Sequence, residues 1–99
     1  MRRIAYLKDR DNFGNEIVVF DNETNYLVVE IDREIVSYFF VDLALTRLYP
    51  MNTYMKKSGI AYDAMDPNWA PKKIDIDLHK YGFSSCPEWL KTLLRCSKR

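Results

Sequence analysis

The stretch from residue 33 to residue 49 constrains the fold most, because it contains more apolar side chains than one face of a surface element can hide. Eleven of its 17 residues are apolar, and at 100° per residue they leave almost no polar stripe. Asp32 precedes the stretch as a possible N-cap and Pro50 follows it as a stop signal. The pattern predicts a long apolar helix over about 33–49. Its β-branched and aromatic start, residues 35–41, also fits a fourth strand, since short apolar runs are ambiguous by period.

Three short runs before this stretch are typical of β-strands. They cover residues 4–7, 16–20 and 26–31, and segments rich in Asp, Asn and Gly connect them. This arrangement predicts an antiparallel three-stranded meander. The middle run is apolar on both faces, so something must cover its second face.

The sequence after Pro50 alternates between irregular and regular patterns. Residues 51–58 indicate a short helix ended by Gly59, and an irregular loop follows to about Pro71. Strict alternation at 74–78 indicates a half-buried edge strand. Residues 86–97 predict a C-terminal helix that begins with a capping box, Ser85 to Glu88. The whole chain, residues 1–99, is therefore expected to form a single domain of the α+β class.

A chain of 99 residues has little material with which to enclose a helix that is apolar on all sides. We therefore expect a homodimer, with the helix or the sheet at the interface. The candidate interface residues are Phe39, Phe40 and Leu43.

The residue counts argue against a cofactor. The three glycines lie too far apart to form a phosphate-binding loop, and one histidine with two cysteines cannot complete a structural zinc site without carboxylates. Cys86 and Cys96 are expected to be free thiols, because ten residues of helix would hold them too far apart to bridge. A soluble, cytoplasmic protein is expected, since no signal-peptide pattern or membrane-length apolar run occurs.

One group of residues has the chemistry of a metal site. On a strand over 74–78, Asp75, Asp77 and His79 would project from the same face, where they could hold Mg²⁺ or Mn²⁺. A metal-dependent phosphodiesterase or nuclease is therefore an alternative interpretation. The simpler interpretation is a solvated face of an edge strand.

Charge is distributed unevenly along the chain. Residues 1–70 carry 8 basic and 11 acidic groups, whereas residues 71–99 carry 7 basic and 3 acidic groups. Helical spacing would place four of the cations in one stripe on the last helix, where they suit either the helix C-terminus or an acidic partner. The stripe comprises Lys91, Arg95, Lys98 and Arg99.

Two aromatic residues in the irregular loop, Tyr62 and Trp69, are either a satellite core or anchors for a partner. Together with the basic helix, they predict a small non-enzymatic interaction protein that binds a macromolecular partner, of the kind common among accessory proteins of viruses and mobile elements. No catalytic residue is predicted. Weak nucleic-acid binding is a further alternative, not favoured because the overall charge is only +1.

Overall fold

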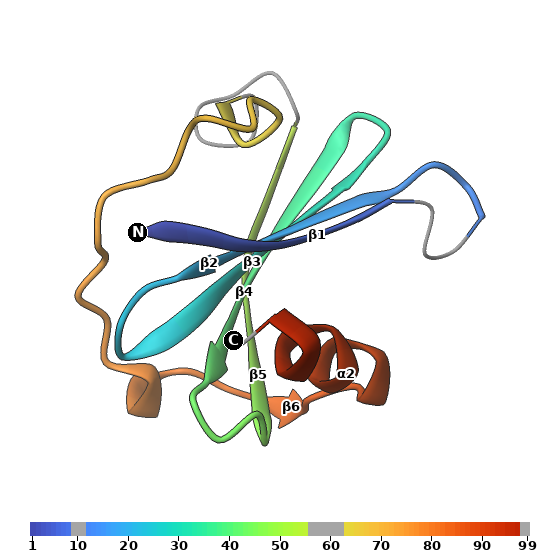
Figure 1. Ribbon diagram of the computed structural model, residues 1–99. Helices are drawn as coiled ribbons and strands as arrows, with labels where there is room; N and C mark the ends of the chain where they lie inside the picture. The colour runs from blue at the N-terminus through green and yellow to red at the C-terminus, as the bar shows by residue number, and fades with distance from the viewer. Residues whose placement is uncertain (9–11, 56–62, 98–99) are drawn as a thin grey trace.

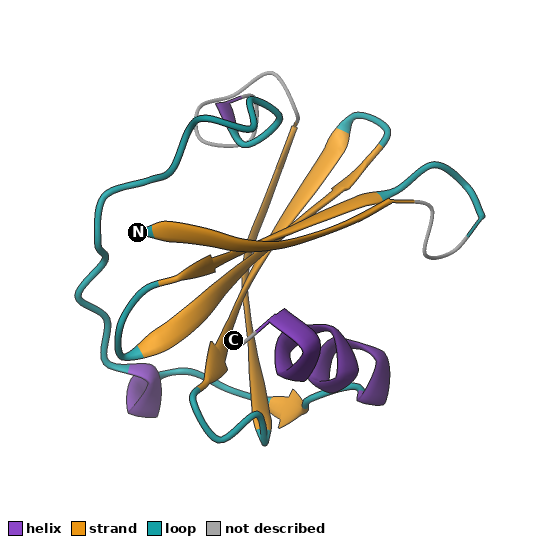
Figure 2. Ribbon diagram, in the orientation of Figure 1, coloured by secondary structure: helices purple, strands orange, loops and turns teal. Residues whose placement is uncertain are grey.

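The computed structural model describes residues 1–8, 12–55 and 63–97, and its centre is one antiparallel sheet (Figures 1 and 2). The strands lie side by side in sequence order, so each strand pairs with the next one along the chain. A 3-10 helix precedes the last strand, and one α-helix follows it. The elements are β1 (Arg2–Lys8), β2 (Glu16–Asp21), β3 (Asn25–Asp32), β4 (Ile35–Asp42), β5 (Arg47–Met55), η1 (Leu78–Lys80), β6 (Ser84–Ser85) and α2 (Glu88–Ser97).

The α+β class is correct, but the predicted helix over 33–49 is wrong. Residues 35–42 form β4, and residues from Arg47 onward form β5, which pairs with β4 as a hairpin. Val36 and Phe40 belong to one buried cluster and Val41 to the other. A strand covered on both faces is apolar on both faces, so it has the same composition as an enclosed helix.

Pro50 lies within β5 instead of stopping a helix. Within the part of the chain that the structure describes, β6 pairs with Arg47 and Leu48 and no strand pairs with β5 beyond them on that side. Pro50 therefore lies at an edge of the described sheet, a position in which sheets tolerate proline. The short helix predicted over 51–58 is also wrong for its first five residues. Residues 51–55 continue β5, and residues 56–62 lie outside the described part of the chain.

The other predicted elements have mixed outcomes. The three N-terminal runs correspond to β1, β2 and β3, but they form half of a six-stranded sheet and not a separate three-stranded meander. Residues 74–78 are not an edge strand. The C-terminal helix is confirmed as Glu88–Ser97, although Ser85 pairs in β6 and does not cap it. The first turn of α2 is anchored by the Pro87 carbonyl, which accepts from the N–H groups of Leu90 and Lys91.

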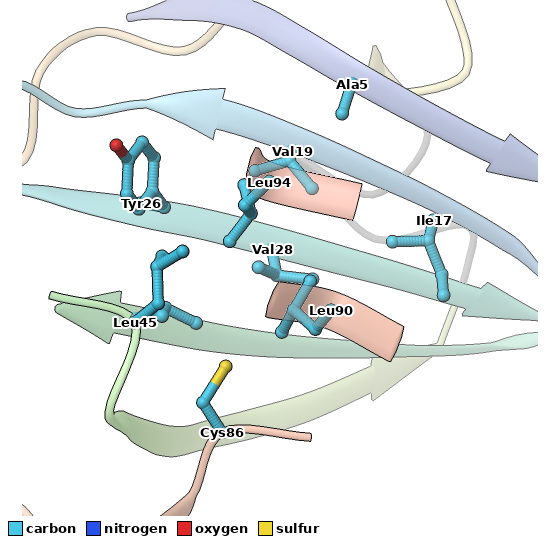
Figure 3. Close-up of a cluster of buried hydrophobic side chains, with 10 residues drawn as sticks. Ala5, Ile17, Val19, Tyr26, Val28, Leu45, Cys86, Leu90 and Leu94 are labelled. Carbon is cyan, nitrogen blue, oxygen red and sulfur yellow. The ribbon is translucent and has the colours of Figure 1, made fainter. Parts of the chain in front are cut away.

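Helix α2 covers one face of the sheet, here called the helix face (Figure 3). Leu90 and Leu94 are four residues apart, so they point to the same side of the helix, and both are fully buried. They pack with alternate residues of the strands. The buried members of this cluster are Ala5, Ile17, Val19, Tyr26, Val28, Val41, Leu45, Cys86, Leu90 and Leu94.

An irregular segment, residues 63–77, covers the opposite face of the sheet and is here called the strap. Figure 1 shows it running along one side of the sheet towards η1. It contributes Ala64 and Trp69 to the second buried cluster, together with Ile74 and Ile76. Asp75 points outward, so the predicted alternation correctly indicates which side chains face the core.

The predicted homodimer depended on an apolar helix too large for one chain to enclose, and that helix does not exist. Phe40 is buried against the strap face and Phe39 is half-buried on the helix face, both within their own chain. Of the three candidate interface residues only Leu43 is exposed, at 46%. Dimerisation itself stays a prediction, which sedimentation would test.

The turn between β4 and β5 is organised by one carboxylate. Asp42 accepts hydrogen bonds from the backbone N–H groups of Thr46 (2.9 Å) and Arg47 (2.8 Å), and from the Thr46 hydroxyl. Partial burial opposes ionisation of Asp42, but these hydrogen bonds outweigh it and lower the pKa of the carboxyl below its ordinary value. The same turn holds Leu45 at φ 60°, a conformation that costs a non-glycine residue about 1 kcal/mol. Burial of the Leu45 side chain on the helix face offsets that cost.

Candidate functional site

The structure does not assemble the residues of the predicted metal site. Residues 71–77 form no strand, and Asp75 and Asp77 are engaged locally. Asp75 lies 3.7 Å from the Lys73 ammonium, and the Asp77 carboxylate accepts from the backbone N–H of His79 (3.1 Å). Within residues 1–8, 12–55 and 63–97, no three His, Cys, Asp or Glu side chains converge on a position that could hold a metal ion.

The predicted basic stripe on the last helix is only partly available. Lys91 is bound to Glu88 at 3.1 Å, one turn earlier on the same helix. Arg95 is exposed in the last turn of α2. Lys98 and Arg99 lie outside the described residues, so their part in a stripe stays a prediction.

Trp69 of the predicted aromatic loop contributes to the core. Trp69 is half-buried, and its ring meets that of Phe20 edge to face, with centroids 6.0 Å apart. This is the packing geometry of a satellite core, so Trp69 supports the strap. Tyr62 lies outside the described residues.

A different set of residues forms an exposed aromatic surface at the β6 edge of the sheet. Tyr81 is 45% exposed and Phe83 is 55% exposed. The guanidinium carbon of Arg47 lies 4.2 Å from the centroid of the Phe83 ring, which is a close cation–π contact. Arg47, Tyr81 and Phe83 are called the aromatic patch below.

Pairing between strands builds this patch from distant parts of the chain. Arg47 pairs with Ser85 and Leu48 with Ser84, which brings Phe83 to the side of β5. The Phe83 ring also lies 5.8 Å from that of Tyr49, which is buried on the strap face. Tyr81 precedes Phe83 by two residues, and its backbone is extended (φ −118°, ψ 151°).

Sequence reasoning missed the aromatic patch because its residues are far apart and show no periodic pattern. The available signal was the Tyr-Gly-Phe segment at 81–83, which follows no apolar period and therefore has no role in a predicted element. The partner arginine was hidden inside the stretch that composition assigned to a helix.

The thiols do not form a reactive site in the described part of the chain. Cys86 and Cys96 are both free, as expected, and they differ in environment. Cys86 is buried beneath α2, and this burial raises the pKa of its thiol, which keeps it in the protonated, weakly nucleophilic form at neutral pH.

Within the described residues, no helix has the length and apolar character needed to cross a membrane. Comparison with known proteins adds no assignment: no protein-family model, no curated protein sequence and no solved structure matches this chain.

Proposed function

We propose that this chain is a small interaction protein that binds another protein through the aromatic patch. The observation that carries the proposal is the cation–π contact of Arg47 with the exposed Phe83 ring, two residues along the chain from an exposed Tyr81. Tyrosine and arginine are enriched among the residues that dominate binding energy at protein interfaces, and aromatic side chains supply large contact areas. We therefore propose the segment around Phe83 as the binding surface, in place of the loop containing Trp69.

Contacts within the chain itself hold Phe83 in place in the absence of a partner. Phe83 has Arg47 at 4.2 Å on one side and the buried Tyr49 ring at 5.8 Å on another. A side chain already held in place loses less conformational entropy on binding, so more of its contact energy appears as affinity. The guanidinium that stacks on Phe83 still has N–H donors at its edge, and these suit a carboxylate or carbonyl group of a partner.

The first experiment identifies the partner through the patch itself. A photo-crosslinking amino acid replaces Tyr81 in the protein expressed in its native cells, and a second protein carries it at Tyr6. Tyr6 is a matched control, because it is also an exposed tyrosine near an arginine, with the Arg3 guanidinium 5.6 Å from its ring. We expect one protein to crosslink from position 81 and not from position 6.

The second experiment measures affinity with that purified protein. Phe83→Ala and Arg47→Ala should each weaken binding at least tenfold, because truncation of a central interface residue commonly costs 2 kcal/mol or more. Tyr6→Ala should bind like the wild type. Unchanged affinity in both patch variants, with folding intact by circular dichroism, would refute the proposal.

A further inference from the structure

A second surface lies at the end of the sheet that carries the β3–β4 turn (Figure 1), where Phe13 also contributes to its lining. It is an open concavity of about 580 Å³. Phe13 is 72% exposed there and Ile35 is 43% exposed. We call it the Phe13 concavity. Its lining residues are Phe13, Asp32, Arg33, Glu34 and Ile35.

The strand register explains why an apolar side chain is exposed at this end. Asp32 pairs with Ile35, so only Arg33 and Glu34 lie between β3 and β4. Paired residues of antiparallel strands project to the same face, which places Ile35 beside the Asp32 carboxylate. The next residue, Val36, points to the strap face and is fully buried. Ile35 therefore lies on the opposite face, the helix face, and at this end of it the side chain is still 43% exposed.

The charge of the lining is negative. Among the described lining residues, Asp32 and Glu34 outnumber the cation Arg33, and neither carboxylate makes a hydrogen bond or ion pair there. Glu30 adds a third carboxylate two residues before Asp32 on the same face of β3, where it accepts from the Asn15 amide (3.4 Å). The concavity thus combines an apolar floor with unpaired anionic groups at its rim.

We propose that the Phe13 concavity binds an extended peptide segment of a partner protein in which one apolar side chain is flanked by lysine or arginine. The apolar side chain packs between Phe13 and Ile35, and its burial removes exposed apolar surface from water at about 25 cal/mol per Å². The flanking cations face Asp32 and Glu34. Acidic peptides and nucleic acids meet like charge at this rim, so electrostatic complementarity selects against them.

This inference goes beyond the proposed function, because it assigns a second surface with its own ligand chemistry. The two surfaces share no residue. The proposal for the concavity can therefore be tested separately from the proposal for the aromatic patch. Variants that test one surface serve as controls for the other.

The test uses the full-length protein and three fluorescein-labelled heptapeptides, with binding followed by fluorescence anisotropy. The parent peptide is Gly-Lys-Lys-Leu-Lys-Lys-Gly. One altered peptide has serine in place of leucine, and the other has glutamate in place of every lysine. We expect the parent to bind at least tenfold more tightly than either, and to bind more weakly as salt is raised, because exposed charges are screened.

Protein variants locate the binding. Phe13→Ser and the double variant Asp32→Asn with Glu34→Gln should each reduce parent-peptide affinity at least tenfold. Both sites are exposed, so the fold should be retained, and the melting temperature checks this. Phe83→Ser is the matched control, since it also removes an exposed phenylalanine, and it should leave affinity unchanged.

Four outcomes overturn the proposal. Equal binding of the three peptides, or no binding of the parent, excludes the stated ligand chemistry. Equal loss in Phe13→Ser and Phe83→Ser places the binding elsewhere. Concentration-dependent self-association by sedimentation that is lost in Phe13→Ser assigns the concavity to a second copy of this chain.

Discussion

The two faces of the sheet are covered in physically different ways. On the helix face, α2 satisfies its interior backbone hydrogen bonds internally and contributes two fully buried leucines, Leu90 and Leu94. On the strap face an irregular segment covers the sheet. Because this segment has no regular internal hydrogen bonding, its backbone polar groups need partners from other parts of the chain. The Met1 amino group donates to the Pro71 carbonyl (2.7 Å), and an Arg3 N–H donates to the Asp66 carbonyl (2.9 Å).

The strongest of these anchors is a buried asparagine in the β2–β3 turn. The Asn22 amide donates to the Ile74 carbonyl (2.8 Å) and accepts from the Ile74 N–H (2.9 Å), so it pairs with the strap as a neighbouring strand would. It also donates to the Asn25 side chain (2.8 Å). A helix can thus cover a sheet by apolar burial, whereas an irregular segment needs specific polar contacts from the sheet it covers.

The largest effect is expected on the helix face. Leu94→Ala should lower the free energy of unfolding by about 3 kcal/mol, because it removes a fully buried side chain and leaves a cavity. Urea denaturation measures this. Ile76→Ala in the half-buried strap is the matched comparison and should cost clearly less. Equal losses in the two variants would show that the helix and the strap contribute equally to stability through apolar burial.

The second-largest loss of stability is expected when the anchor of the strap is removed. Asn22→Ala should cost about 2 kcal/mol, since it leaves the partly buried N–H and C=O of Ile74 without their partner. Limited proteolysis should then cut first within 63–77, before the sheet is lost. Leu94→Ala is the control, and it should show no preferential cleavage there. An Asn22→Ala strap as resistant as that of the wild type would contradict the anchoring role.

Acidification should lower the stability of the fold through the Asp42 carboxylate in the turn between β4 and β5. The pKa of Asp42 is lower in the folded chain than the ordinary value of 3.8, so its contribution to stability is present above about pH 4 and is lost as pH falls through the folded pKa. Asp42→Asn should cost about 1 kcal/mol at neutral pH and should have a shallower decline in stability between pH 4 and 2. Chemical denaturation across that range measures both. Parallel pH profiles for the two proteins would exclude this role of Asp42.

The smallest effect is expected from the strap's exposed ion pairs. Lys73 lies 3.1 Å from Glu23 and 3.7 Å from Asp75, and Glu23 chiefly raises the pKa of the Lys73 ammonium. All three side chains face solvent, where ion pairs contribute little. Lys73→Ala should leave the urea midpoint and the protease resistance of the strap unchanged. A clear loss of either would show that charge, and not Asn22, holds the strap.

Local patterns in the sequence were sufficient where the physical cause is local. The C-terminal helix was predictable because Leu90 and Leu94, four residues apart, mark one side of a helix whatever surrounds it. The alternation at Ile74 and Ile76 correctly indicated which side chains face inward, since an extended backbone alternates with or without a neighbouring strand.

The stretch 33–49 could not be assigned by composition alone, because only pairing with the neighbouring strands and covering from both faces distinguish a central strand from an enclosed helix. The aromatic patch and the anchor of the strap likewise depend on contacts that composition does not reveal. Arg47 meets Phe83 only through the β5–β6 pairing. Asn22 meets Ile74, 52 residues away, only when the strap crosses the sheet.

The amino-acid sequence by itself determined that apolar surface had to be buried on both faces of the second strand, and it determined the period of the last helix. The tertiary structure alone decided what buries that surface and which polar and aromatic side chains come together at its edges. The physical reason is that periodicity records the environment of each residue, whereas the identity of its neighbours depends on chain segments far away in the sequence.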